Sequence, residues 1–386
     1  LSIKCYFNYL MIMRKVTTKL FALYLPQFHQ IPENDKFWGK GFTDWVSVKN
    51  AKPIFDGHNQ PKVPLNENYY DLSNEECVEW QAKLAYDHGI YGFAVYHYWF
   101  NNKQNILTRP AEILRDSKIV NVKYFYIWDN NNWKRSWSNV KGNDWAPSAE
   151  NSNKTGPSIL IPYILGEEND WENHYNYLRK HFKSDNYEKN DNKPIFAIIS
   201  YSNEMYNMCQ FWNKLAKKDG FDGLYFIVMR GRSNEKLQWA SKYTYQPHYV
   251  SFWKKSLLQK AIERIFPFMK KTQSEARFFD YDQVWQSIIK QSEKDKDKTI
   301  INCAFVDYDD SPRRGATKSS IFKGATPEKF KKYFKQLLEL NEDQGKEYLF
   351  ITAWNEWGEG AFIEPDEINK MSYLDAIKEV VHEINK

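Results

Sequence analysis

Residues 348–365 read YLFITAWNEWGEGAFIEP, and both the fold and the chemistry of the chain can be inferred outward from this stretch. The apolar run 348–351 predicts a buried strand, and Glu356 and Glu359 follow it, three positions apart, among tryptophans and glycines. Positions three apart in a helical turn share a face, with Cβ atoms about 5–6 Å apart. Two carboxyl groups at that spacing disfavour each other's ionisation, so one is expected to stay protonated near neutral pH. An acid and a base or nucleophile beside flat aromatic rings suit glycosidic-bond chemistry.

The composition is that of a globular chain with many aromatic residues. The 386 residues are 42% hydrophobic and 27% charged, which is ordinary, but 17% are aromatic, including 15 Trp and 26 Tyr. A tyrosine-rich core would explain this abundance, and so would a carbohydrate cleft. Many of the aromatic residues stand beside Asn, Asp or Gly rather than in apolar blocks, which fits the cleft.

Charge and cysteine content argue against several function classes. The net charge of +5 comes from dispersed lysines without a basic stripe, so we expect no nucleic-acid partner. The four cysteines are widely separated, which argues against a zinc site or a disulfide framework and fits a reducing compartment. No run of about 18 apolar residues occurs, so no membrane span is expected.

The N-terminus has a distinct character. Leu1 is not a usual start, and residues 1–15 are expected to be an N-terminal extension that is not translated if Met11 or Met13 is the true start. Residues 5–13 are only partly apolar and lack the long core and cleavage site of a signal peptide. We therefore expect a cytoplasmic protein, with residues 16–386 forming a single domain.

Strand-like and helix-like segments alternate along the chain. The predicted strands are residues 20–25, 91–100, 122–127, 193–200, 224–229, 243–247, 299–306 and 348–351. Helices are predicted within 72–88, at 109–117, 171–182 and 203–220, around Leu237, and at 252–296, 326–343 and 373–384. The long segments 27–68 and 137–162 are expected to be functional loops, the second lying over the barrel mouth. This order predicts an α/β fold, a (β/α)8 TIM barrel with long βα loops. An open doubly wound sheet is the alternative, but no G-x-G-x-x-G turn follows the first strand.

In such a barrel the segments after all eight strands converge on one face, which carries the active site. The strand ends expected around one pocket are His97, Trp128, Tyr201, Arg230, Gln246, Asp307 and Glu356.

Five motifs resemble a known group of proteins. They are residues 24–29 (YLPQFH), 37–45 (FWGKGFTDW), 97–100 (HYWF), 309–314 (DDSPRR) and 354–365 (WNEWGEGAFIEP). The last resembles the signature of the endo-α-mannosidases of glycoside hydrolase family 99. The combination, which spans nearly the whole chain, is more similar to the bacterial polysaccharide-locus proteins called WbsX, described as glycosyltransferases or as family 99-like.

The resemblance implies a (β/α)8 barrel that needs neither a metal nor a cofactor. It also implies that Glu356 acts as a base on the sugar 2-hydroxyl, through a 1,2-anhydro intermediate, and that Glu359 is the general acid and base at the glycosidic oxygen, although the two roles could be exchanged. We predict substrate contacts from Tyr24, His29, Trp45, His97, Tyr98, Trp99, Trp128, Asp129, Asn131, Trp133, Asp307, Arg313, Trp354, Asn355 and Trp357.

Some of these assignments have competing explanations. A lone histidine is more often a packed structural residue, but the Tyr-Trp context of His97 favours contact with a sugar, whereas His29 fits either role. Arg313 and Arg314 would recognise an acidic glycan or pair with Asp307 and Asp309, and we favour the ion pair. Residues 307–309 and 280–282 match the D-x-D of metal-dependent transferases, a pattern that is common by chance.

One loop departs from the resembling family, in which the sequence Trp-Ala-Asn-Glu-Asn-Trp is usual. Here residues 128–133 read WDNNNW, so Asn131 replaces the glutamate and Asp129 adds a carboxylate.

From the glutamate pair and the five motifs we predict a glycoside-active enzyme for a bacterial surface or O-antigen type polysaccharide or oligosaccharide. A glycosyltransferase of polysaccharide or lipopolysaccharide biosynthesis is the first alternative, and a non-catalytic glycan-binding protein is the second.

Overall fold

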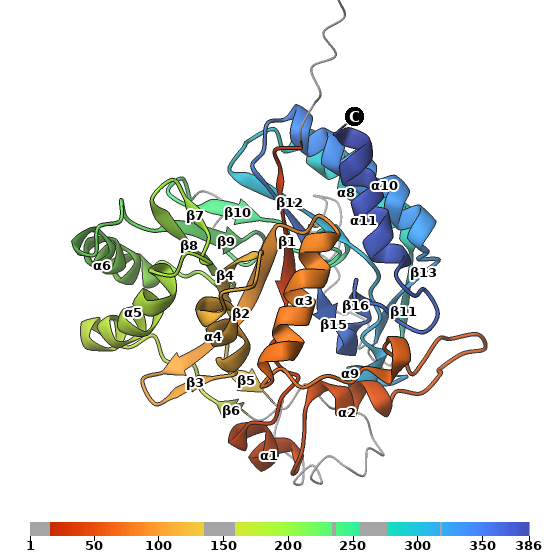
Figure 1. Ribbon diagram of the computed structural model, residues 1–386, viewed down its shortest axis with the longest axis horizontal. Coiled ribbons are helices and arrows are strands. Elements are labelled where there is room, and N and C mark those ends of the chain that lie inside the picture. Colours follow the sequence, from red (N-terminus) through yellow and green to blue (C-terminus); the bar gives the residue numbers. More distant parts are fainter. Residues whose placement is uncertain (1–15, 135–158, 234–236, 255–275, 317–318, 386) are drawn as a thin grey trace, which may run out of the picture.

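A closed barrel of parallel strands forms the centre of the computed structural model, which describes residues 16–134, 159–233, 237–254, 276–316 and 319–385. In order around the barrel the strands are β1 (Lys19–Tyr24), β2 (Gly92–Asn101), β4 (Lys123–Trp128), β8 (Lys193–Ile198), β9 (Tyr225–Met229), β10 (Ser241–Tyr243), β12 (Ile300–Phe305) and β14 (Tyr348–Thr352). Strand β1 pairs with β14 on one side and with β2 on the other, which closes the ring (Figure 1). The predicted (β/α)8 TIM barrel is confirmed.

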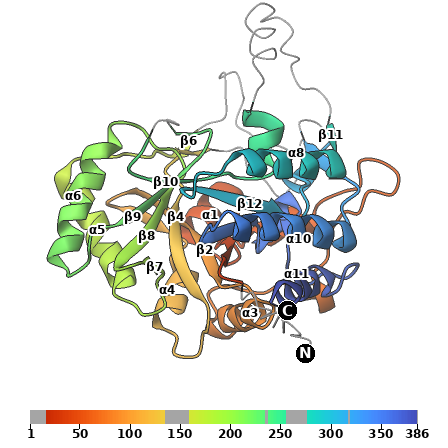
Figure 2. The ribbon, with the colours of Figure 1, turned by 90° about the horizontal axis from the view of Figure 1, so that it is seen from above.

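Helices cover the outside of the barrel. They are α3 (Glu75–Asp87), α4 (Arg109–Asp116), α5 (Glu168–Phe182), α6 (Met205–Lys218), α8 (Tyr281–Lys294), α10 (Pro327–Asp343) and α11 (Ser372–Ile384). Figure 2 shows α5 and α6 on one side of the strands and α8, α10 and α11 on the other. No helix within the described residues combines the length and the apolar character that crossing a bilayer requires.

Several predicted element boundaries were wrong. The sixth strand is β10, which ends at Tyr243, where the predicted strand began. Residues 230–233 and 237–240 form turns and extended chain instead of the helix expected around Leu237. The helix predicted over 252–296 is interrupted, because β11 (Arg277–Asp280) pairs there with β13 (Ser320–Lys323). Residues 1–15 and most of the predicted excursion at 137–162 lie outside the described residues.

Aromatic rings fill the barrel interior. Phe21 on β1 packs against Phe125 on β4, with ring centroids 4.9 Å apart, although β2 lies between these two strands. Phe350 on β14 likewise contacts Phe125 at 5.6 Å and Tyr243 on β10 at 5.5 Å. Contacts between strands that are not neighbours must cross the interior, so these four rings form part of the packed core that is typical of such barrels.

Gly92 on β2 provides the space that this aromatic layer needs. A Cβ atom at this position would lie 2.4 Å from the Lys123 carbonyl oxygen and 2.4 Å from the Phe21 ring. We predict that Gly92→Ala lowers the free energy of unfolding by about 1–3 kcal/mol, the usual cost of overpacking a core. Urea unfolding would measure the change. Wild-type stability in this variant would show that the core can rearrange around the added methyl.

The chain segments at the carboxyl ends of the strands form a cap of short elements. They are α1 (Pro32–Trp38), α2 (Asp44–Lys49), η1 (Leu65–Glu67), α9 (Ser311–Arg314), and a hairpin of β15 (Asn355–Glu356) and β16 (Ala361–Phe362) with η4 (Trp357–Glu359) in its turn. Figure 1 places α2 and α9 beside this hairpin, although they lie more than 250 residues apart in sequence. The hairpin carries both glutamates of the opening stretch.

Candidate active site

The hairpin that carries Glu356 and Glu359 is anchored to the barrel by the residues just before it. Trp354 is fully buried and packs against Phe93, with ring centroids 5.1 Å apart. Asn355 is also fully buried, and its side chain accepts a hydrogen bond from the Leu25 amide at 2.7 Å and donates one to the Leu25 carbonyl at 3.0 Å. These contacts fix the start of the acidic loop to the end of β1, so Trp354 and Asn355 hold the loop in place.

Both glutamates contact one guanidinium group. Arg313 Nη1 lies 2.7 Å from Glu359 Oε1, and Arg313 Nη2 lies 3.2 Å from Glu356 Oε2. Arg313 Nη2 also lies 3.0 Å from Asp44 Oδ2. We call Arg313, Asp44, Glu356 and Glu359 the carboxylate cluster. The structure therefore brings together the two glutamates that the sequence paired and adds a third carboxylate that sequence reasoning missed.

The charges in the carboxylate cluster do not balance, because three carboxyl groups share one cation. Burial, the neighbouring Glu359 and Asp44 raise the pKa of Glu356 to about 8, against the opposing effect of Arg313. Burial alone would lower the pKa of Arg313, but the three carboxylates outweigh it and raise that pKa further. Glu356 thus holds a proton at neutral pH, as the sequence spacing predicted for one member of the pair.

Gly358 allows Asp44 and Arg313 to approach the loop backbone. Its amide donates a hydrogen bond to Asp44 Oδ2 at 3.2 Å. A Cβ atom on Gly358 would lie 2.5 Å from Arg313 Nε and 2.6 Å from Asp44 Oδ2. The glycine between the two glutamates is therefore needed for the charged contacts of the carboxylate cluster.

Four buried tyrosines surround the carboxylate cluster. Burial raises the pKa of Tyr96, Tyr98 and Tyr245 well above 10, and the charge of Glu356 adds to the rise in each. Burial likewise raises the pKa of Tyr308, with a further contribution from Glu359. These phenols keep their protons and can donate hydrogen bonds to sugar oxygens. Only Tyr98 was predicted, although alternation along a strand also places Tyr96 on its face.

The same alternation directs the predicted residues His97 and Trp99 to the opposite face of β2. His97 is 2% exposed, and its Nε2 atom lies 2.8 Å from His174 Nε2 on α5. Trp99 stacks on His174, with centroids 4.3 Å apart, and its carbonyl accepts a hydrogen bond from Trp128 Nε1. Burial lowers the pKa of His97 to about 3. The structure does not bring His97, Trp99 or Trp128 to the carboxylate cluster.

The loop after β4 reaches the same region through Tyr98. The Trp133 ring stacks near Tyr98, with centroids 6.1 Å apart, and the charge of Asp129 contributes to the raised pKa of Tyr98. Asn131 donates a hydrogen bond to Asp129 Oδ1 at 2.6 Å and accepts one from Ser200 Oγ at 2.9 Å. The side chain that replaces the family glutamate thus orients a neighbouring carboxylate.

Trp357, between the two glutamates, belongs to a buried polar network around Glu364. Glu364 accepts hydrogen bonds from Trp357 Nε1, Tyr70 Oη and Gln81 Nε2, each at 2.7 Å. Tyr24 donates to Gln81 Oε1 at 2.6 Å, so the predicted contact residue Tyr24 supports this network. Burial raises the pKa of Glu364 to about 7, and its hydrogen-bond donors oppose the rise.

The raised pKa of Glu364 predicts a pH-dependent stability. The folded protein retains the Glu364 proton up to about pH 7, whereas the unfolded chain releases it near 4.5, so stability falls as pH rises through this window. We predict that Glu364→Gln, which cannot ionise, reduces the loss of unfolding free energy between pH 4.5 and 7.5 by about 3 kcal/mol. Urea unfolding at the two pH values tests this. An unchanged pH dependence would show that Glu364 ionises normally.

Two other predicted contact residues lie in the segment after β1. Trp45 donates a hydrogen bond from Nε1 to the Tyr70 carbonyl at 2.9 Å, and its ring lies 5.4 Å from Trp357. It therefore supports the acidic loop from the side of α2. His29 is 5% exposed, and burial lowers its pKa. No hydrogen bond or ion pair within the described residues joins His29 to the carboxylate cluster.

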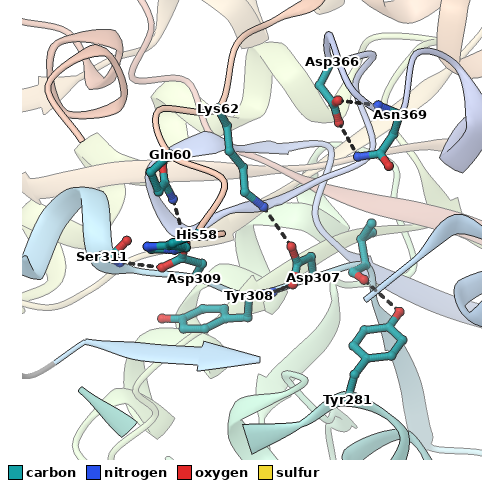
Figure 3. Close-up of polar contacts among 11 residues, drawn as sticks. His58, Gln60, Lys62, Tyr281, Asp307, Tyr308, Asp309, Ser311, Asp366 and Asn369 are labelled. Atoms are coloured by element: carbon teal, nitrogen blue, oxygen red, sulfur yellow. Dashed lines mark hydrogen bonds and ion pairs between the residues drawn. The ribbon is translucent and has the colours of Figure 1, made fainter. Parts of the chain in front are cut away.

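Asp307 and Asp309, which form the D-x-D pattern, lie in the segment after β12. Side chains of the loop after α2 contact both aspartates (Figure 3). Lys62 Nζ lies 2.8 Å from Asp307 Oδ2, while Asp309 Oδ2 lies 2.8 Å from His58 Nε2 and 2.7 Å from Gln60 Nε2. Burial would raise the pKa of Asp309, but His58, Lys62 and Gln60 together lower it. Within the described residues, no group of three or more His, Cys, Asp or Glu is arranged to hold a metal ion.

The predicted pairing of the two arginines with these aspartates was wrong. Arg313 contacts Asp44, Glu356 and Glu359, and Arg314 pairs with Asp310 at 2.7 Å. The reason is geometric. The short helix α9 directs its two consecutive arginines to different sides, and the loop at residues 58–62 supplies the partners of Asp307 and Asp309.

Comparison with known proteins identifies the family of this chain. A model of the family described as glycosyltransferase WbsX matches residues 20–377. The chain belongs to the WbsX family. This WbsX-family chain is 25% identical over 372 residues to the uncharacterized protein WxcX of Xanthomonas campestris pv. campestris strain B100. The match covers 94% of the chain and 49% of WxcX, so the chain spans about half the length of that relative.

Solved structures share the barrel of this WbsX-family chain. A glycoside hydrolase-like protein has a TM-score of 0.55 at 14% identity, covering 94% of this chain and 93% of its own. The family 99 endo-α-mannosidase from Bacteroides thetaiotaomicron has a TM-score of 0.51 at 14% identity, covering 95% and 96% of the two chains. At these identities the likeness establishes the fold alone.

Proposed function

We propose that the protein breaks or remakes glycosidic bonds in a bacterial surface or O-antigen type polysaccharide through Glu356 and Glu359. The observation that carries the proposal is the carboxylate cluster, in which one guanidinium holds two glutamates together at the carboxyl end of β14. Glycoside chemistry needs two carboxyl groups in different protonation states. One glutamate is buried with a raised pKa and the other is more exposed, and the proposed reaction uses the form in which Glu359 carries the proton and Glu356 is ionised.

The two glutamates differ in accessibility, which favours different roles. The Glu356 side chain is 6% exposed and that of Glu359 is 21% exposed. In the proposed reaction, the Glu356 carboxylate takes the proton of the sugar 2-hydroxyl, and O2 attacks C1. The C1 bond to the leaving oxygen breaks as Glu359 gives that oxygen a proton. Water then opens the 1,2-anhydro sugar, with its proton passing to Glu359 while Glu356 returns a proton to O2.

This assignment predicts a specific pH profile. A base must be ionised, and the pKa of Glu356 is raised to about 8. We expect kcat/KM to rise with pH as Glu356 ionises, with an apparent pKa near 8 on the rising limb. Steady-state kinetics on any converted glycan would test this. Activity that is lost as pH rises through 8 would instead make Glu356 the acid and exchange the two roles.

The proposal is tested by product analysis. The protein would be incubated with α-mannosides and with bacterial surface polysaccharides, and the products would be identified by mass spectrometry. Release of shorter glycans supports hydrolysis. No conversion of any glycan, combined with binding, would instead indicate a glycan-binding protein.

The family description supports a glycosyltransferase as the second candidate. Such an enzyme would bind a sugar nucleotide. Calorimetry with a sugar nucleotide, with and without Mn²⁺, would therefore distinguish a glycosyltransferase from a hydrolase. Tight binding of a sugar nucleotide would overturn the hydrolase proposal. The hydrogen-bonded and ion-paired state of Asp307 and Asp309 favours hydrolysis, because the D-x-D carboxylates are already engaged by residues of the protein.

A further inference from the structure

A cavity lies on the flank of the barrel, beside the acidic loop. It has a volume of about 680 Å³ and lies between α3, the segment 64–70 and the segment that follows β16. Trp357 forms part of its wall, so the cavity adjoins the residue between the two glutamates. We call it the flank cavity.

An exposed aromatic ring faces the flank cavity. Trp80 on α3 keeps 39% of its surface exposed, although tryptophan is usually largely buried. Tyr69 also lines the cavity, and the Tyr70 and Trp80 rings lie 6.4 Å apart. Open aromatic faces of this kind offer the apolar C–H face of a pyranose a surface to lie on, while the ring edges remain wet.

The rim of the flank cavity carries a strained backbone. Asn66 and Glu67 both have positive φ, at 57° and 54°, in a region that costs non-glycine residues about 1–3 kcal/mol each. The strain is held in place by neighbouring bonds: the Leu65 amide donates to the Pro365 carbonyl at 3.0 Å, and the Asn66 amide donates to Glu367 Oε1 at 2.6 Å. This conformation is therefore imposed by the surrounding structure.

The strained segment presents polar side chains that the protein does not use itself. Asn66, Glu67 and Asn68 are exposed, and their side chains form no hydrogen bond with any other residue that the structure describes. Two amides and a carboxylate, placed near an open tryptophan ring, offer the donors and acceptors that sugar hydroxyl groups require.

The charge of the flank cavity limits its ligand. Glu67 supplies a carboxylate at its rim, and the described lining residues include no lysine or arginine. Such a lining disfavours uronic acids and phosphorylated sugars. We propose that the flank cavity binds a neutral or amino-substituted pyranose of a glycan, as an additional subsite beside the acidic loop; this rests on the proposed function for the identity of the glycan.

The test measures binding to a microarray of bacterial surface glycans, using the full chain with Glu359→Gln to suppress turnover. Trp80→Ala in this background is expected to weaken retention of neutral and amino-sugar glycans about tenfold, as loss of an aromatic anchor does. Trp80→Phe should largely restore retention. Tyr86→Ala is the matched control, because Tyr86 is a 55% exposed aromatic residue on the same helix that does not line the cavity.

The outcomes separate this inference from the proposed function. Retention that is unchanged by Trp80→Ala, restricted to acidic glycans, or absent for every glycan would overturn the flank subsite. Turnover by the wild-type protein is measured separately on the same glycans. Turnover without Trp80-dependent binding would leave the proposed function standing, whereas Trp80-dependent binding without turnover would support the subsite and overturn the enzymatic proposal.

Discussion

Replacing Arg313 by methionine is expected to lower the free energy of unfolding at pH 7 by about 3–5 kcal/mol, because it removes the cation from buried carboxyl groups. The guanidinium contacts Asp44, Glu356 and Glu359, and the Asp44 and Glu356 side chains are 0% and 6% exposed. Without Arg313, burial and mutual repulsion would act on these groups unopposed. Urea unfolding measures the change.

Arg314→Met is the matched control for this prediction. Arg314 stands one position further along α9, is 46% exposed, and pairs only with Asp310 among the described residues. Asp310 is only 7% exposed, but it also accepts a hydrogen bond from the Ser320 amide at 2.6 Å, and water can replace the half-exposed guanidinium, so we expect this substitution to have a smaller effect than Arg313→Met. The cost of Arg313→Met should also shrink at pH 4, where the carboxyl groups take up protons more readily. Equal effects of the two substitutions would show that the carboxylate cluster does not depend on its arginine.

The fold could be predicted from the sequence to a large extent. Each barrel strand is a short apolar run followed by a polar, aromatic segment. Because this pattern repeats eight times, it predicts the fold class even where individual strand boundaries are wrong. The sixth strand was misplaced because residues 241–247 contain few aliphatic residues, so its end could not be read from hydrophobicity. The strand β11 was missed because its pairing with β13 joins residues some 40 positions apart.

The candidate site could be predicted in part. The pairing of Glu356 and Glu359 could be inferred from the sequence because the two lie within four consecutive residues. Asp44 was missed as a site residue, although it lies in the motif at residues 37–45, since that motif does not show that its carboxylate faces Glu356 and Glu359. Its role arises only when α2 and α9 meet the acidic loop. Side chains alternate along β2, so Tyr98 lies on one face and His97 and Trp99 lie on the other. Applying this alternation to the sequence would have removed His97 and Trp99 from the predicted contacts near Tyr98.

Asn131, which stands where the family resemblance leads us to expect a glutamate, binds a neighbouring carboxyl group. Asp129 lies two residues before Asn131 and receives its hydrogen bond, and burial raises the pKa of Asp129 while that bond opposes the rise. The loop therefore still brings a carboxyl group near Tyr98, from a different position.

The second large effect concerns the glutamates themselves. We predict that Glu356→Gln and Glu359→Gln each lower kcat/KM by about 10²–10⁴-fold, the usual contribution of general acid or base catalysis. Glu356→Gln should fold normally, because burial and neighbouring carboxylates already keep Glu356 protonated at neutral pH. Glu379→Gln is the control: Glu379 lies on α11, its side chain is 59% exposed, and it pairs with Lys331.

The most direct test of the central claim is therefore glycan turnover by the wild-type protein and these three variants, with mass analysis of the products. The account predicts shortened or transferred glycans from the wild-type protein and from Glu379→Gln, and almost none from Glu356→Gln or Glu359→Gln. Turnover that survives both substitutions would contradict a mechanism based on these two carboxyl groups.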